Sequence, residues 1–470
     1  MRRLLTITSI YGFAALLGPL VAFALTPLYI GAIGVTGYGT VDLVQSVAQL
    51  LLPLALWGLP TTMIARAPST DGLTTHQPIF AGALRLVILV ACGVSILAMG
   101  VAPLVAHYVQ RSDVAWLVVV YALSLPGAAV YGVVLAMARL LAHTGHAVVL
   151  MVVYVLVLAM SRITLVLWFD AGVTGMIVAL AGTNILVALL AIAISWRWWW
   201  ATTRWDEVWA FGRLGLPLVP ASMAVWSLLF IDRWILVQYV SPLVLGQYAI
   251  ATVVASLMAF VAEPFKQAWQ PMARRQLQPQ VTMWVLTVYV AMSLLVGALI
   301  VMCTPVLLQL IGGRDAVGAT AYVPWLLIAP LLSGVVAIVS MPAIRAQQTG
   351  RLAWATLLGA TVNIGMNIWL IPQFGAHGAA WATAIAACVI PLLLGWMNSA
   401  AAAMTYDWRR LGALTCAWIG YCVLLTYVQP VGYRLVAFAG LCVLVALIIS
   451  VWRWRQYWAL WQQPFWSERG

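Results

Sequence analysis

Apolar residues form long runs along this chain, and short polar clusters separate the runs. A membrane-spanning helix needs about 20 predominantly apolar residues. Runs of that kind predict spans at residues 8–33, 39–65, 77–106, 114–141, 146–169, 172–195, 213–240, 244–271, 280–311, 318–344, 351–372, 376–398, 410–428 and 432–452. The pattern therefore predicts an all-α polytopic membrane protein with about 14 transmembrane helices.

The composition supports lipid as the solvent of this chain. Of its 470 residues, 65% are hydrophobic and 7% are charged, with a mean hydropathy of +1.04. An ordinary soluble domain carries about 25% charged residues. The net charge of +12 would suit nucleic acid, but the basic residues lie in short patches between apolar runs. We therefore expect the membrane lipid bilayer as a partner and no nucleic acid.

Arginine placement predicts the orientation of the helices. If the N-terminus is cytoplasmic, sixteen arginines lie in inner segments, and the outer loops hold only Arg111, Arg314 and Arg434. Cytoplasmic loops of membrane proteins are enriched in lysine and arginine. The chain is therefore expected in a bacterial or archaeal cytoplasmic (inner) membrane, multi-pass, with both termini cytoplasmic.

An internal repeat at a shift of about 205 residues divides the sequence. Matching pairs are Ala142–His146 with Gln347–Arg351, Gly172–Gly175 with Gly375–Gly378, Tyr38 with Tyr248, and Arg66 with Arg274–Arg275. Each repeat holds six helices, so both have the same orientation and are related by a pseudo-twofold axis along the membrane normal.

The repeat sets the expected domain boundaries. They are an N-terminal six-helix lobe over 1–196, a cytoplasmic junction over 197–212 and a C-terminal six-helix lobe over 213–398. Residues 399–470 supply two extra helices and a cytoplasmic tail. The substrate path is expected between the lobes.

Polar side chains recur at helical spacing on two predicted helices that are repeat partners. The residues are Asp42, Gln45, Ser46 and Gln49 on the second helix, and Thr252, Ser256, Glu263, Lys266, Gln267 and Gln270 on the eighth. Because ionisable groups are costly in a membrane, these stripes indicate a water-filled cavity. The alternative is that they form hydrogen bonds between helices.

Charged residues in these helices have functional and structural interpretations. Asp232 and Arg233 are adjacent and should point to different helix faces, so they are not expected to pair with each other. They line the cavity or belong to a structural ion-pair network. Glu263 and Lys266 could simply neutralise each other, and Asp42, in the first turn of its predicted helix, would favour the helix dipole regardless of function.

Other motifs do not indicate enzymatic chemistry. The segment Gly34–Gly39 is glycine-rich, but it is predicted to be an outer loop and not a phosphate-binding turn. The six cysteines lack metal-site spacing and are interpreted as small core residues, and His143 and His146 are too few for a metal site. We therefore expect a transporter and not an enzyme, with no metal and no cofactor.

Five segments resemble Wzx-type polysaccharide flippases, which belong to the MOP superfamily together with MATE exporters and the lipid II flippase. They are Thr26–Gly34, Gly37–Gly39, Ile231–Leu236, Leu245–Tyr248 and Gly375–Ala380. The resemblance covers nearly the whole chain, and the seventh-helix segment is its most specific element. It implies two six-helix lobes arranged in a V that open alternately to either side of the membrane.

The resemblance also implies a substrate, an oligosaccharide on an undecaprenyl pyrophosphate carrier that is flipped from the cytoplasmic to the periplasmic leaflet. Other polysaccharide assembly proteins are potential partners. Arg233, Lys266 and Arg66 would contact the pyrophosphate. Gln45, Gln49 and Gln267 would line the cavity, and Asp42, Asp232 and Glu263 would be coupling or structural charges.

The intramembrane charges depart from a strongly cationic pocket. Four cations, Arg85, Arg162, Arg233 and Lys266, stand against three acids, Asp42, Asp232 and Glu263. The acids would allow coupling to H+ or Na+, so a MATE-like cation-coupled small-molecule exporter stays open. A membrane glycosyltransferase or polymerase would need a sizeable outer loop, which the sequence lacks. A non-transporting scaffold would leave the polar stripes unexplained.

Overall fold

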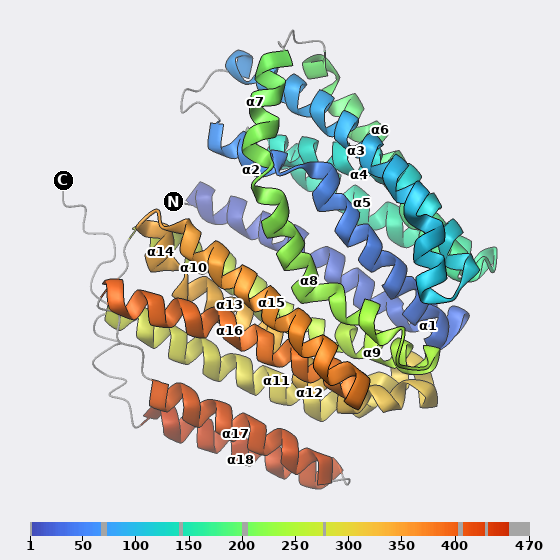
Figure 1. Cartoon of the computed structure of the whole chain (residues 1–470). Helices are drawn as coiled ribbons and strands as arrows, with labels where there is room; N and C mark the ends of the chain where they lie inside the picture. The colour runs from blue at the N-terminus through green and yellow to red at the C-terminus, as the bar shows by residue number, and fades with distance from the viewer. Residues whose placement is uncertain are drawn as a thin grey trace, which may run out of the picture. The chain divides into compact units, whose positions relative to one another are not determined.

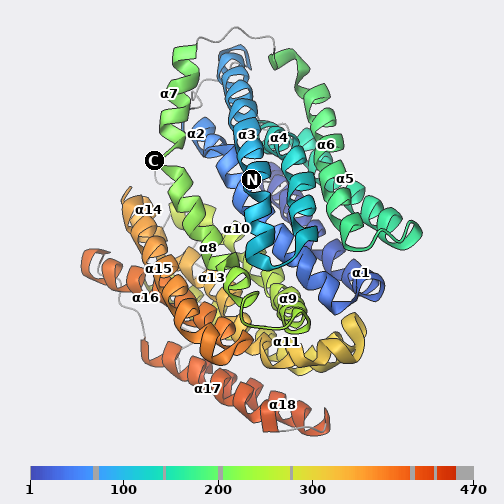
Figure 2. The same cartoon turned by 45° about the vertical axis from the view of Figure 1, so that its right-hand side comes forward.

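The computed structural model describes residues 2–66, 73–140, 144–199, 205–275, 279–402, 408–427 and 431–450. Within these ranges the regular structure is entirely helical, which confirms the predicted all-α class. The chain divides into two compact units, Met1–Ala249 and Ile250–Gly470. Figures 1 and 2 show their helices, and each unit is described by itself.

The bounds of the elements follow the apolar runs. In the first unit they are α1 (Arg2–Leu56), α2 (Leu59–Arg66), α3 (Leu73–Val109), α4 (Ser112–Leu140), α5 (Thr144–Ile163), a π-helical turn (Thr164–Trp168), α6 (Gly172–Trp199), α7 (Trp205–Gly215) and α8 (Leu218–Leu236). Helix α9 (Pro242–Ser256) crosses the unit boundary. The second unit holds α10 (Ala259–Arg275), α11 (Pro279–Ala316), a 3-10 turn (Val317–Ala321), α12 (Val323–Leu326), α13 (Ile328–Val339), α14 (Met341–Arg345), α15 (Thr349–Phe374), α16 (Ala376–Ala402), α17 (Trp408–Tyr427) and α18 (Val431–Ser450).

Ten helices of the described chain are long and apolar enough to cross a membrane, or eleven if the bent pair α9 and α10 is one span. The first, Leu17–Met63, has 47 residues. At 1.5 Å per residue it would be about 70 Å long, more than twice the ~30 Å hydrocarbon core, so it contains two predicted spans. Shorter apolar helices lie at 412–422 and 435–446. Every predicted span thus falls on helical segments, but the number of about 14 membrane crossings stays a prediction.

The predicted outer loop Gly34–Gly39 is wrong, because helix continues through this segment. Only Gly34 is non-helical, with φ 73° and ψ 168°. This conformation is accessible to glycine and strained for residues with a Cβ atom. One glycine therefore replaces the loop between the first two predicted spans.

Four predicted spans are broken, and in the seventh the break is at Leu216–Pro217, between α7 and α8. The second breaks at Trp57–Gly58, and the eighth bends by 43° between α9 and α10. The predicted polar stripe of the eighth helix therefore does not follow one straight helix. The span 318–344 consists of short pieces, and α12 and α14 each begin with a proline in the first turn, which has no N–H to continue the preceding helix.

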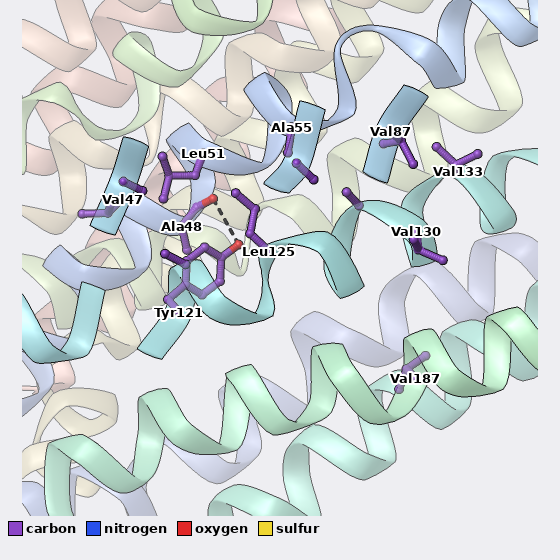
Figure 3. Packing of buried hydrophobic residues seen from close by; sticks show 14 of the residues in the cluster. Val47, Ala48, Leu51, Ala55, Val87, Tyr121, Leu125, Val130, Val133 and Val187 are labelled. Atoms are coloured by element: carbon purple, nitrogen blue, oxygen red, sulfur yellow. Dashed lines mark hydrogen bonds between the residues drawn. The ribbon is translucent and has the colours of Figure 1, made fainter. Parts of the chain in front are cut away.

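Small side chains bring the helices of the first unit close together. Figure 3 shows Val47, Ala48, Leu51 and Ala55 of α1 near Leu125 and Tyr121 of α4, with the Tyr121 hydroxyl donating to the carbonyl of Ala48 at 3.3 Å. Lipid tails are as apolar as these side chains, so close van der Waals packing and hydrogen bonds hold such helices together.

The second unit uses the same means. Tyr289 of α11 packs directly on Gly334 of α13, and its hydroxyl donates to the carbonyl of Leu331 at 2.9 Å. Helices α17 and α18 form a pair beside α11 (Figure 1). The hydroxyl of Tyr421 on α17 donates to the carbonyl of Ala298 at 3.2 Å. The two extra helices are therefore packed parts of this unit.

Large apolar side chains cover the surface of the spans, as expected for helices that face lipid. Leu97, Leu104 and Met160 are 69%, 67% and 60% exposed. The cysteines are also at this surface, since Cys92 and Cys416 are exposed and the other four are partly exposed. Their interpretation as core residues is therefore wrong for Cys92 and Cys416, and the other four lie at the edge of the packed interior.

Helices α7 and α8 pack with the first unit. Helix α7 contacts α2 and α3, and α8 contacts α1. The sequence repeat assigns residues 213–398, which include α8, to the second lobe, and this division stays a prediction. Part of the predicted junction 197–212 is helical, because α7 begins at Trp205.

Candidate functional site

Four side chains of the first unit form a buried polar group that we call the Arg233 cluster: Asp42 on α1, Asp232 and Arg233 on α8, and Tyr248 on α9. The Arg233 Nε atom donates to Asp42 at 2.8 Å, and its Nη1 atom donates to Asp232 at 2.9 Å and to the Leu229 carbonyl at 2.6 Å. Arg233 is only 3% exposed. Two carboxylates thus surround one guanidinium, for a formal net charge of −1.

Asp232 has three donors around its carboxylate. Besides the guanidinium of Arg233, the backbone N–H of Arg233 donates to Oδ1 at 2.9 Å, and the hydroxyl of Tyr248 donates to Oδ2. A buried charge is stable when its lone pairs are satisfied in this way. Asp42 keeps a more open position, with 23% of its side chain exposed.

Ser46 forms a second contact between α1 and α8, one helical turn from Asp42. The indole N–H of Trp234 donates to the Ser46 hydroxyl at 3.0 Å, and that of Trp226 donates to the Ser46 carbonyl at 2.8 Å. Each indole has one donor and no acceptor, so both find partners on α1.

Two glycines let α9 approach α1 beside the cluster. A Cβ atom on Gly246 would lie 2.1 Å from the carbonyl oxygen of Val35, and one on Gly39 would lie 2.7 Å from the nitrogen of Gly246. Backbones can approach this closely because glycine has no side chain at the contact. The motifs Gly37–Gly39 and Leu245–Tyr248 therefore pack against each other.

The end of α3 joins the same region. The hydroxyl of Tyr108 donates to the carbonyl of Trp234 at 3.1 Å, and Gln238 donates to the carbonyl of Tyr108. Arg111, which pairs with Asp113, also donates to the hydroxyl of Thr40. The ends of α3 and α8 and the starts of α9 and of the second α1 segment thus converge at the side predicted to be outer.

Two predictions about these charges are wrong. Asp232 and Arg233 do pair, because the long arginine side chain folds back to the carboxylate of its neighbour. Asp42 does not lie in a first helical turn, because helix begins directly after Gly34, about two turns earlier. The helix dipole therefore does not explain why an acid stands at position 42. The ion pair with Arg233 explains it.

The other predicted site residues are not members of the Arg233 cluster. On α1, Gln45 is partly exposed and Gln49 is exposed. On α10, Glu263 and Lys266 form an ion pair, as the neutralising alternative predicted, and Gln267 beside them is partly exposed. The side chain of Arg66 lies outside the described residues. A role of these residues in a cavity stays a prediction.

Tyr248 was missed as a site residue, although it is the last residue of the motif Leu245–Tyr248. Its side chain is fully buried and reaches across to Asp232. A cavity of about 660 Å³ lies beside this region, at the turn between α3 and α4, and includes His107, Gln110 and Arg111. No residue of the Arg233 cluster lines it.

Comparison with solved structures identifies the fold. The chain shares its fold with solved membrane transporters and a flippase, at 11–16% sequence identity. The inward-facing structure of a multidrug resistance MATE transporter of the MOP superfamily superposes with a TM-score of 0.59 and 14% identity, over 83% of this chain and 98% of the other.

A flippase covers more of the chain. Lipid II flippase MurJ, in an inward closed conformation, superposes with a TM-score of 0.70 and 11% identity, over 96% of this chain and 99% of the flippase. The MATE multidrug transporter DinF-BH gives 0.65 and 15%, over 84% and 94%. No protein-family model and no curated protein matches the sequence.

Proposed function

We propose that this chain is a flippase that translocates an undecaprenyl-pyrophosphate-linked oligosaccharide from the cytoplasmic to the periplasmic leaflet by alternating access. The observation that carries the proposal is the likeness to the lipid II flippase over 96% of the chain. The MATE neighbours cover 83–87% of it. The resemblance of five sequence segments to Wzx-type flippases supports the same class of substrate.

In this proposal the Arg233 cluster holds the predicted outer side closed. Asp42 belongs to the first sequence repeat, and Asp232, Arg233 and Tyr248 belong to the second. Separation of the repeats at this side requires the Asp42–Arg233 bond at 2.8 Å and the Gly39–Gly246 contact to break. Because two carboxylates already offset its charge, Arg233 is better suited to this closing contact than to a pyrophosphate.

A MATE-like exporter of small cations is the second candidate. The likeness to DinF-BH supports it. Such an exporter would use Asp42 or Asp232 to take a coupling ion or a cationic substrate. Both carboxylates accept hydrogen bonds from Arg233, so a cation would first have to displace the arginine.

Transport by the purified protein in liposomes distinguishes the candidates. The probe is a fluorescent undecaprenyl-pyrophosphate disaccharide, and its leaflet is read by quenching with a reductant that does not cross the membrane. We expect redistribution of the probe that requires the protein, is lost in Arg233→Gln, and persists in Arg345→Gln, an exposed arginine outside the cluster.

Runs with and without a pH or Na+ gradient test for coupling. Failure to move this and other lipid-linked glycans, together with efflux of a cationic dye, would contradict the flippase proposal and favour the exporter.

A further inference from the structure

The intramembrane cations differ in how their charges are balanced. Arg233 faces Asp42 and Asp232, and Lys266 pairs with Glu263. Arg85 also has an interaction partner. Among the described residues Arg162, on α5, forms no ion pair. Its Nε atom is buried, and no described residue accepts a hydrogen bond from it.

Aromatic side chains surround Arg162. Its guanidinium carbon lies 6.0 Å from the ring centre of Tyr29 on α1, which is only 3% exposed. Tyr38 on α1 and Tyr154 on α5 are the other titratable groups close enough to interact with it electrostatically. An arginine that snorkels would extend along the lipid-facing surface to the interface. Contact with a buried ring places this one inside the first unit.

The local backbone is also specialised. Arg162 is followed within one turn by the π-helical segment Thr164–Trp168. Turns of π-helix occur preferentially at functional sites, because the inserted residue disfavours regular helix. The kink at Gly34 brings Tyr38 back to the first α1 segment, beside Thr26.

We propose that Arg162, with Tyr29, Tyr38 and Tyr154, is a binding site for a phosphate-type anion. A guanidinium keeps its positive charge even inside a membrane, so Arg162 needs a negative group beside it. Among the described residues no carboxylate pairs with Arg162. The fork of N–H donors matches phosphate oxygens, and the Tyr29 hydroxyl can add a further donor. The Tyr154 hydroxyl already donates to Asn184 at 3.2 Å, so Tyr154 contributes its position and not a proton. A cationic ligand would be repelled.

The proposed function suggests which molecule carries this anion. Only this identification of the source rests on the proposed function; the site itself does not. The pyrophosphate of a lipid-linked oligosaccharide is one source, and the phosphate of an anionic lipid headgroup is the other. The site moves the expected pyrophosphate contact from Arg233, which is balanced by two acids, to Arg162.

Titration of the full-length protein in detergent with inorganic pyrophosphate tests the site. We expect Arg162→Gln to weaken binding at least tenfold, Arg162→Lys and Tyr29→Phe to weaken it about threefold or more, and Arg345→Gln to leave it unchanged. Wild-type affinity in Arg162→Gln would overturn the proposal. If that variant does not fold, wild-type affinity in both Arg162→Lys and Tyr29→Phe would overturn it.

Competition identifies the source. Displacement of pyrophosphate by farnesyl pyrophosphate but not by phosphatidylglycerol supports the substrate, and the reverse supports a lipid headgroup and contradicts the substrate assignment.

Transport separates the two proposals. Flipping by the wild type that persists fully in Arg162→Gln overturns the role of the site in transport. Arg162-dependent binding without wild-type flipping leaves the site intact and contradicts the proposed function.

Discussion

Arg233 illustrates why a charged residue persists inside a membrane protein. Replacement of a buried ion pair by apolar residues is often neutral or stabilising, so ion pairing alone is weak evidence for a stability role. Removal of one partner is different, because it leaves the other charge buried and unpaired. In the Arg233 cluster the guanidinium joins α1 to α8, and Asp232 joins α8 to α9. The loss caused by removing each acid should therefore follow how deeply that acid is buried.

Arg233→Gln should lower the free energy of unfolding by about 3–5 kcal/mol, because Asp42 and Asp232 then lose their counter-charge. Asp232→Asn should cost more than Asp42→Asn, since the side chain of Asp232 is 6% exposed and that of Asp42 is 23% exposed. Thermal unfolding of the purified protein measures this order.

A double-mutant cycle provides the control for the Asp42–Arg233 bond. The double variant Asp42→Asn with Arg233→Gln should cost less than the sum of its single variants by about 1 kcal/mol or more. Additive losses would mean that the two side chains do not stabilise each other.

At the scale of helices, glycines determine where α1 bends and what it can touch. Gly34 allows the kink, and Gly39 and Gly246 allow the contact with α9. Gly31 lies on the same helix with open space around its Cβ position, so it offers a matched control.

Gly246→Ala should destabilise the protein by about 1–3 kcal/mol and impair transport, because the new methyl group overlaps the carbonyl oxygen of Val35. Gly31→Ala should instead be neutral or stabilising by up to about 1 kcal/mol, from helix propensity alone. Unfolding midpoints measure both. Equal effects of the two variants would rule out the close contact.

Gly34→Ala should cost about 1–3 kcal/mol for a different reason, namely backbone strain at φ 73° and ψ 168°. Thermal unfolding measures this loss, and the Gly31→Ala variant is the control. An unchanged midpoint would show that helix runs through residue 34 without a kink.

For the whole molecule, orientation is the prediction on which the direction of transport depends. In a background without the six cysteines, Ser112→Cys should react with an impermeant maleimide in intact cells, because its turn is predicted to be outside. Gln348→Cys should react only after permeabilisation. Both positions are exposed at or beside turns. The opposite labelling pattern would invert the topology.

Alternating access predicts that a covalent bridge at the outer side stops transport. Tyr108→Cys with Gln238→Cys joins two exposed positions that the structure holds together by a hydrogen bond. A short thiol-reactive cross-linker should reduce flipping at least tenfold, and reductant should restore it. Each single-cysteine variant serves as the control. Full transport by the bridged protein would exclude opening between α3 and α8.

Much of the fold followed from the sequence alone, because a lipid solvent imposes a simple rule. Each span needs a long apolar run with its backbone hydrogen bonds satisfied internally. The predicted spans therefore correspond to helices, including the last pair. Asp42, Asp232 and Arg233 could also be singled out, because charged residues are rare and costly in such runs.

The tertiary structure decided what those residues contact. No helical periodicity predicts that Arg233 folds back to Asp232 while reaching Asp42, which is 191 positions away in the chain. Tyr248 and Arg162 are similar cases: Tyr248 is buried against a carboxylate, and Arg162 forms no ion pair among the described residues. Composition determines how many charges lie in the membrane. Only the packing of distant helices determines which of these charges pair with one another.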